Sequence, residues 1–132
     1  MADLVAFAER YASAWSNNDA EAFAAFYAED GTFRINDGEV SAGREEIAAT
    51  AASFMEGFPD MVVRLLKVTR EGDYVNFHWH WTGTNTGPGG TGNAVDLQGH
   101  ERWLLNDTGL IVESLGHMDD GEYQRQLAGG EQ

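Results

Sequence analysis

The pattern of apolar and polar residues divides the chain into a helical first part and a strand-rich second part. Apolar residues recur at helical spacing over residues 3–17, which predicts an amphipathic helix. Asp19 is suited to cap a second helix, and a third helix is expected between Gly43 and Pro59, because proline disrupts a helix interior. The apolar residues expected to face inward from these helices are Leu4, Phe7, Ala8, Tyr11, Trp15, Phe23, Phe26, Tyr27, Ile47, Ala51, Phe54, Met55 and Phe58.

Alternation of apolar and polar residues predicts strands in the remaining segments. A short strand over residues 32–35 is expected to follow a turn at residues 29–31, and Asn36-Asp37-Gly38 is typical of a hairpin turn. The later strands are expected at residues 61–70, 74–82, 94–105 and 110–118. The glycine-rich segment 83–93 is expected to be a mobile strand connection or a pocket lid, and Asp119 is placed to begin a short terminal helix.

Helices followed by long, bent antiparallel strands favour an α+β fold. The expected architecture is a cone-shaped, curved antiparallel or mixed sheet that wraps around the N-terminal helices and encloses a central pocket. A chain of 132 residues is long enough for one domain with a real core. We therefore expect a single domain over residues 1–128 and a disordered tail over residues 129–132.

The charge of the chain argues against several classes of partner. Acidic residues number 22 and basic residues 8, which gives a net charge of −14. A field of that sign repels phosphate groups, so neither nucleic acid nor an anionic membrane is an expected partner. The excess of acid, with Lys67 as the single lysine, fits either the cytoplasm of a salt-loving organism or an acidic mesophilic protein.

Cysteine and long apolar segments are both missing from the sequence. The absence of cysteine excludes disulfides, thiolate catalysis and sulfur-bound metals. No apolar run approaches the ~20 residues that span a bilayer, and the N-terminus lacks the pattern of a signal peptide. A cytoplasmic location is the resulting expectation.

Several short segments, taken in order, resemble the SnoaL-like branch of the nuclear-transport-factor-2-like superfamily. They are Tyr11–Trp15, Phe26–Phe33, Gly43–Ile47, Trp81–Gly87 and Gly109–Glu113. The resemblance implies a cone-shaped α+β domain and a homodimer formed through the outer face of the sheet. It does not select one activity, because the superfamily contains ketosteroid isomerases, polyketide cyclases, epoxide hydrolases and pocket proteins without known chemistry.

The resemblance to cyclases and to limonene-epoxide-hydrolase-like enzymes implies an aspartate on the last strand. That position aligns with Gly116, which cannot transfer a proton. Asp119 lies three residues further on and could substitute, but it is also the expected cap of the terminal helix. Both of these mechanisms therefore lack their key acid or base.

The resemblance to ketosteroid isomerases implies a tyrosine on the first helix, a base after the first strand and an acid on the penultimate strand. Tyr11 and Glu101 match the tyrosine and the acid. The base position aligns with Ile35, leaving Asn36 or Asp37 only if the register slips.

Glu101 is also a candidate on physical grounds. Strand geometry places it on the same face as Trp103, so that the glutamate faces the pocket if the tryptophan does. Burial would raise the pKa of its carboxyl, as a hydrogen-bond donor or general acid requires. The alternative is a glutamate at the rim, paired with an arginine across the sheet.

The paired histidines His78 and His80 are expected on the outer face of the sheet, because their apolar neighbours claim the core. A dimer interface or an exposed surface is favoured there over a metal site, since no well-placed carboxylate completes the ligands. His100 is expected to be exposed, and His117 could lie on either face.

The aromatic residues predict a pocket for a small apolar molecule. Its expected ligand-binding residues are Trp15, Phe33, Phe54, Phe58, Trp79 and Trp103. An enzyme built this way would perform cofactor-free isomerisation, cyclisation, hydration or a hydrolase-type reaction on a ketone-like substrate. Tyr11 and Glu101 would polarise the carbonyl, and the base would be Asp37 or a water molecule. The alternative is a non-catalytic homodimeric binding module of the same fold.

Overall fold

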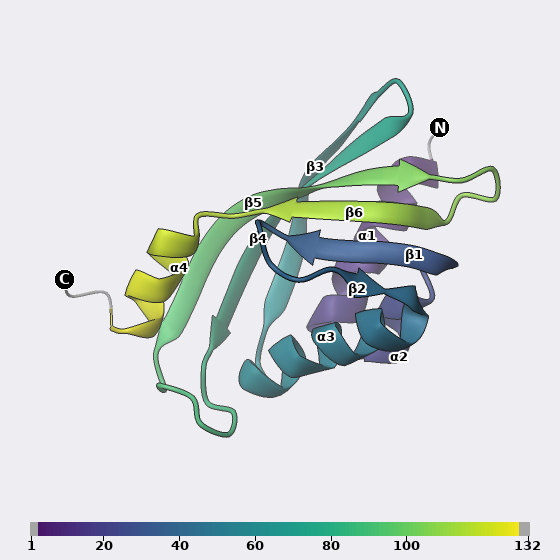
Figure 1. Ribbon diagram of the computed structural model, residues 1–132. Helices are drawn as coiled ribbons and strands as arrows, with labels where there is room; N and C mark the ends of the chain where they lie inside the picture. Colours follow the sequence, from purple (N-terminus) through teal and green to yellow (C-terminus); the bar gives the residue numbers. More distant parts are fainter. Residues whose placement is uncertain (1–2, 130–132) are drawn as a thin grey trace.

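The computed structural model describes residues 3–129, which form an α+β fold (Figure 1). The helices are α1 (Asp3–Ser16), α2 (Ala20–Ala24), α3 (Gly43–Gly57) and α4 (Asp120–Leu127). The strands are β1 (Tyr27–Ile35), β2 (Ser41–Ala42), β3 (Val62–Glu71), β4 (Tyr74–Thr84), β5 (Ala94–Leu105) and β6 (Ile111–His117). The expected tail at residues 129–132 lies outside the described residues from residue 130 onward, and Gly129 ends a turn after α4.

The six strands form one mixed sheet in the order β2-β1-β6-β5-β4-β3. Strand β1 pairs with β6 in parallel, and all other neighbours are antiparallel. The register of β3 shifts between Leu65 and Lys67, leaving Leu66 half exposed as the extra residue of a bulge. Figure 1 shows the long strands bending around the helices, so the expectation of a curved sheet wrapped around helices is confirmed.

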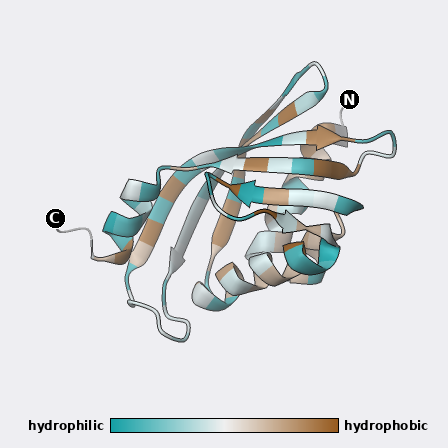
Figure 2. Cartoon of the chain, in the orientation of Figure 1, coloured by the Kyte–Doolittle hydropathy of each residue, from teal (hydrophilic) through white to brown (hydrophobic). Residues whose placement is uncertain are grey.

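The core lies between the concave face of the sheet and helices α1–α3. Apolar and polar residues alternate along the long central strands (Figure 2), and β4 and β5 send alternate side chains into the core. Tyr11, Phe23, Tyr27, Phe77 and Trp103 are fully buried there.

The two expected helix caps are present. The Asp19 side chain accepts a hydrogen bond from the backbone N–H of Ala22, which satisfies one free donor at the start of α2. Asp119 does the same for Glu122 at the start of α4. Asp119 is therefore a cap in this structure, and it does not line the cavity described below.

Two local expectations are wrong. Residues 29–31 are not a turn, because β1 already begins at Tyr27 and continues to Ile35. The register between β1 and β6 shifts after Tyr27, and Gly31 fits there because a Cβ at its position would lie 2.8 Å from the carbonyl oxygen of Ile111. The second helix ends before Phe26 and Tyr27, which pack against the core from the chain that follows it.

The glycine-rich connection between β4 and β5 is tied to the end of α3. The Asn85 side chain donates to the carbonyl oxygen of Gly57 over 3.0 Å, and the backbone N–H of Thr84 donates to Asp60 over 2.7 Å. None of residues 83–93 lines the cavity, so this connection does not act as its lid. Within residues 3–129, no helix is long and apolar enough to cross a membrane.

Candidate functional site

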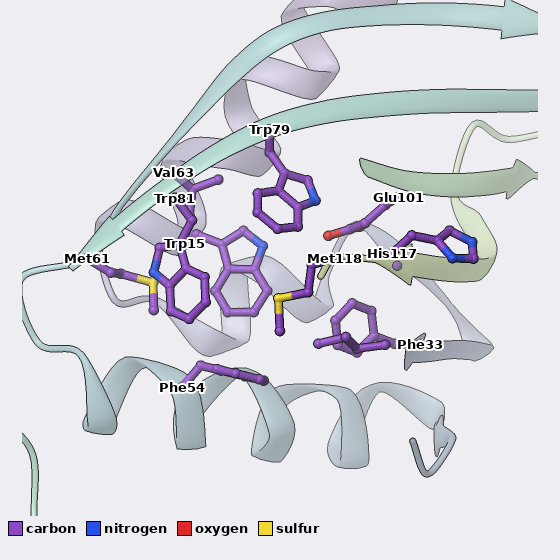
Figure 3. A pocket seen from close by; sticks show the side chains of 12 residues that line it. Trp15, Phe33, Phe54, Met61, Val63, Trp79, Trp81, Glu101, His117 and Met118 are labelled. Carbon is purple, nitrogen blue, oxygen red and sulfur yellow. The ribbon is translucent and has the colours of Figure 1, made fainter. Parts of the chain in front are cut away.

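A small, apolar cavity of about 60 Å³ lies between α1, α3 and the concave face of the sheet (Figure 3). It is lined by Trp15, Phe33, Ile35, Phe54, Met61, Val63, Trp79, Trp81, Glu101, Gly116, His117 and Met118. Pockets for drug-sized ligands measure roughly 300–1,000 Å³. The cavity therefore suits a molecule much smaller than a steroid.

Most of the aromatic residues expected at the pocket line it. Trp15, Phe33, Phe54 and Trp79 do so, whereas Phe58 and Trp103 do not. Phe58 packs edge-on against Trp81 with ring centroids 4.9 Å apart. Trp103 stacks on Phe77 at 5.0 Å, one layer deeper in the core.

Glu101 is the only carboxylate among the lining residues, and it is almost completely buried, with 6% of its surface exposed. Its position follows from the alternation of β5, which turns Glu101 and Trp103 to the concave face. The Oε1 atom accepts hydrogen bonds from three donors. They are the Tyr11 hydroxyl at 2.6 Å, the Trp103 indole N–H at 2.9 Å and the Ser114 hydroxyl at 3.0 Å.

The two oxygens of the Glu101 carboxyl group differ in their hydrogen bonds. No hydrogen bond to Oε2 occurs within residues 3–129, and Figure 3 shows the carboxyl group at the cavity wall. Burial raises the pKa of this carboxyl, and the three hydrogen bonds oppose that rise because they stabilise the charged form. Since Oε1 is occupied by donors, a proton on Glu101 must reside on Oε2.

Tyr11 lies behind Glu101 and does not line the cavity. Its hydroxyl is 2.7 Å from that of Tyr27, and its single proton is used on Glu101, so Tyr27 donates to Tyr11. Both tyrosines are fully buried, and burial, followed by the neighbouring charge of Glu101, raises the pKa of each well above its ordinary value. The arrangement allows Tyr11 to position Glu101, whereas direct contact with a substrate carbonyl was expected.

Asp37, the expected base, does not reach the cavity. It lies in the turn after β1, where its side chain is fully exposed and 3.6 Å from Arg34. Ile35, two residues earlier at the end of β1, lines the cavity with an apolar side chain. The structure therefore leaves Glu101 as the one carboxyl group that lines the described cavity.

Gly116 lies directly beside Glu101, because the two residues are paired between β5 and β6. A Cβ at residue 116 would lie 3.6 Å from the Glu101 Cγ, an ordinary contact. The missing side chain at this position therefore widens the cavity next to the carboxyl group.

Trp81 was assigned to the core by its strand, and it also lines the cavity. Its indole nitrogen is buried without a hydrogen-bond partner among residues 3–129. A buried N–H group without a partner is uncommon. Met61, Val63 and Met118 were also missed, because each lies at the edge of its element.

His78 and His80 lie on the outer face of the sheet as expected. His100 and His117 lie there too, but His100 is half-buried where exposure was expected, and either face was possible for His117. The rings of His78, His100 and His117 form a row across β4, β5 and β6, with centroids 5.5 Å and 4.8 Å apart. The backbone of His117 reaches the cavity, while Figure 3 shows its ring turned away from the indoles. His80 bonds to Asp96 at 2.6 Å. No group of metal-ligating side chains suited to hold a metal ion occurs within residues 3–129.

Solved structures with this fold include proteins of several kinds. A ketosteroid isomerase-like protein from Catenulispora acidiphila DSM 44928, in complex with trimethylamine, is 20% identical; the match covers 92% of each chain with a TM-score of 0.81. A protein described as a SnoaL-like polyketide cyclase from Jannaschia sp. CCS1 is 22% identical. The match covers 95% of this chain and 91% of that one, with a TM-score of 0.81. AclR from Streptomyces galilaeus, described as a hydroxylase, is 22% identical. The match covers 97% of this chain and 82% of that one, with a TM-score of 0.79.

These likenesses establish the nuclear-transport-factor-2-like fold, since identities at this level carry no more than the architecture. None of the curated proteins compared with the chain matches it. The family model of the SnoaL-like domain matches residues 8–114, a span that runs from α1 to β6 and includes both Tyr11 and Glu101. The chain therefore belongs to the SnoaL-like domain family.

Proposed function

We propose that this protein binds a small, mainly apolar molecule in its cavity and that Glu101 performs cofactor-free acid–base chemistry on it. The observation that carries this proposal is the geometry of one carboxyl group. Glu101 is buried in the wall of an apolar cavity, with Oε1 fixed by three donors and Oε2 without a hydrogen bond among the described residues. A small ketone-like compound is the proposed substrate, and the reaction is isomerisation, cyclisation or hydration.

The carboxyl group can act as a proton shuttle. Ionised Glu101 accepts a proton from the carbon next to a carbonyl through Oε2, which leaves an enolate, and it then returns the proton to a different carbon. Because Tyr11, Trp103 and Ser114 hold Oε1, the carboxyl cannot rotate and its reactive oxygen stays aimed at the substrate.

The comparisons support a small-ligand site of this kind. The Jannaschia protein is described as a polyketide cyclase, and the Catenulispora protein was solved with trimethylamine. A cavity of about 60 Å³ fits small molecules of that size better than it fits polycyclic ones.

A second candidate function is a non-catalytic homodimeric binding module. It is favoured by the apolar character of Ile35 and Gly116 at the cavity and by the distance of Asp37 from it. In this case the cavity binds a ligand without converting it, and the outer face of the sheet around His78 and His80 forms the dimer interface.

Exchange of α-protons for deuterium in small ketones tests the two functions. Cyclopentanone, cyclohexanone and 2-cyclohexenone are incubated in D₂O with the wild type, Glu101→Gln and the exposed control Glu9→Gln, and exchange is followed by NMR. Exchange faster than in buffer for the wild type and Glu9→Gln, and lost in Glu101→Gln, supports the enzyme. Ligand binding without accelerated exchange supports the binding module. If the wild type shows no binding and no accelerated exchange, both candidate functions are wrong.

A further inference from the structure

Glu101 has no basic partner. None of the ion pairs formed by residues 3–129 includes it, and its hydrogen-bond donors are two hydroxyl groups and an indole. A buried carboxylate without a counter-charge is costly, whereas one that meets a positive charge is stabilised. An ionised Glu101 therefore has no counter-charge among the described residues.

The cavity wall presents the Glu101 carboxyl group and aromatic side chains to a ligand, and it is poor in free hydrogen-bond donors. The protons of Tyr11, Trp103 and Ser114 are all used on Oε1, so they cannot reach a ligand. The Trp81 indole N–H has no partner in the described part of the chain, but its nitrogen is itself buried and does not face the cavity space. A molecule that brings its own positive charge matches this surface better than one that needs several donors.

The aromatic walls have the composition that binds alkylated ammonium groups. Trp15 comes from α1, Phe54 from α3 and Trp79 from β4, so the rings approach the cavity from different sides (Figure 3). The face of an aromatic ring attracts a cation, and each such contact contributes about 0.5–2 kcal/mol depending on desolvation. The net charge of −14 further concentrates small cations around the molecule.

We infer that the ligand of this cavity carries a small alkylammonium group, with its nitrogen beside Oε2 of Glu101 and its alkyl groups against Trp15, Phe54 and Trp79. The inference rests on the proposed small-ligand site and deepens its second candidate function, in which the cavity binds a ligand without converting it, because an ammonium group beside Oε2 occupies the oxygen that the proton transfer would use. The carboxylate supplies the counter-charge, the rings supply the apolar contacts, and the absent side chain at Gly116 leaves room next to the nitrogen.

Choline and 3,3-dimethylbutan-1-ol form a matched pair of probes, because they differ in whether the central atom is N⁺ or carbon. Titration calorimetry and the indole N–H signals in NMR spectra measure the Kd of each for the wild type. We expect choline to bind at least about tenfold more tightly than the alcohol, which corresponds to about 1.4 kcal/mol. We also expect choline affinity to rise with pH through the pKa of Glu101, while the affinity of the alcohol stays constant.

Two variants separate the contributions of charge and rings. Glu101→Gln keeps an oxygen for the three donors and removes the charge, so the preference for choline should disappear while the alcohol still binds. Phe54→Leu removes one aromatic face and keeps its apolar character, so choline should weaken by about threefold or more and the alcohol should change less. If Glu101→Gln does not fold, the pH dependence in the wild type and the Phe54→Leu comparison still decide the question.

The outcomes distinguish this inference from the proposal beneath it. Equal binding of choline and the alcohol, or a preference for choline that persists without Glu101, overturns the alkylammonium inference and leaves the small-ligand site intact. If neither probe, nor tetramethylammonium, nor the small ketones bind to the folded wild type, both the inference and the proposed function are wrong.

Discussion

Tyr11 on α1 and Glu101 on β5 are joined inside the core by a hydrogen bond of 2.6 Å between the tyrosine hydroxyl and Oε1. The two residues are 90 positions apart in the chain, so the bond connects the first helix with the penultimate strand. A hydrogen bond to a charged oxygen is stronger than one between neutral groups. The contact therefore fixes both the carboxyl group and the position of α1 over the sheet.

Removing the Tyr11 hydroxyl should destabilise the protein. In Tyr11→Phe, Glu101 loses one of its three donors and the hydroxyl of Tyr27 loses its acceptor. We expect the free energy of unfolding to fall by about 1–3 kcal/mol, measured by urea denaturation. The matched control is Tyr74→Phe, because Tyr74 stacks under Arg102 through its ring, which phenylalanine retains. A loss of equal size in both variants would contradict the assigned role of the Tyr11 hydroxyl.

The stability of the protein should depend on pH through Glu101. Burial raises the pKa of this group in the folded state above the ordinary value of 4.5, so the folded protein holds the proton more tightly than the unfolded chain. The stability contributed by this proton is complete below the ordinary pKa and is lost as the pH rises through the raised one.

Glu101→Gln isolates this contribution, because glutamine does not titrate and all other carboxyl groups remain. We expect the free energy of unfolding of the wild type, relative to that of Glu101→Gln, to decrease over this pH range. Denaturant unfolding at a series of pH values measures the difference. A difference that rises with pH would mean that the pKa of Glu101 is lowered by folding.

Substitution by alanine should have different effects on stability at two glycines of the concave face. A Cβ at Gly99 would lie 2.5 Å from both the carbonyl oxygen of His117 and the ring of Trp79, so Gly99→Ala must relieve both contacts. We expect a loss of about 1–3 kcal/mol and a changed fluorescence of the Trp79 indole. At Gly116 the nearest atom is the carbonyl oxygen of Arg34 at 3.4 Å, so Gly116→Ala should fold normally and narrow the cavity.

The measurements for the glycine pair are thermal unfolding and binding of the same small ligands. Gly116→Ala should lower ligand affinity with little change in Tm, whereas the main effect of Gly99→Ala should be a lower Tm. Normal stability of Gly99→Ala would show that β5 and the Trp79 ring can separate without cost.

The pKa of His100 should depend on the neighbouring histidines of the row. Burial, then the neighbouring charges of His117 and His78, lowers the pKa of His100. We expect His117→Gln to raise the pKa of His100, as measured by NMR titration of the imidazole protons. His80→Gln is the control, because His80 pairs with Asp96 outside the row and should leave His100 unchanged. No response of His100 to either substitution would show that the rings do not interact.

The alternation along β5 was sufficient to predict that Glu101 and Trp103 face the core, because a strand allows only two choices of face. The hydrogen bonds of Glu101 could not be predicted in the same way. Whether a buried tyrosine donates to a ligand or to a carboxylate depends on distances between elements far apart in the sequence, and Tyr11 lies 2.6 Å from Glu101. The boundary of the cavity was hidden for the same reason, since Met61 and Met118 reach it from the ends of their elements.

The order in which the strands are synthesised matters for folding, because strands that are neighbours in the sheet lie far apart in the chain. β1 is made early, yet its long neighbour in the sheet is β6, the last strand, and before β6 appears it can pair only with the two-residue β2. Contacts between such distant segments close slowly. A nascent chain that still lacks residue 111 and those that follow therefore exposes the apolar faces of its helices and an open strand edge. The high negative charge then has a use beyond solubility of the finished protein, because like-charged incomplete chains repel one another until the last strand closes the sheet.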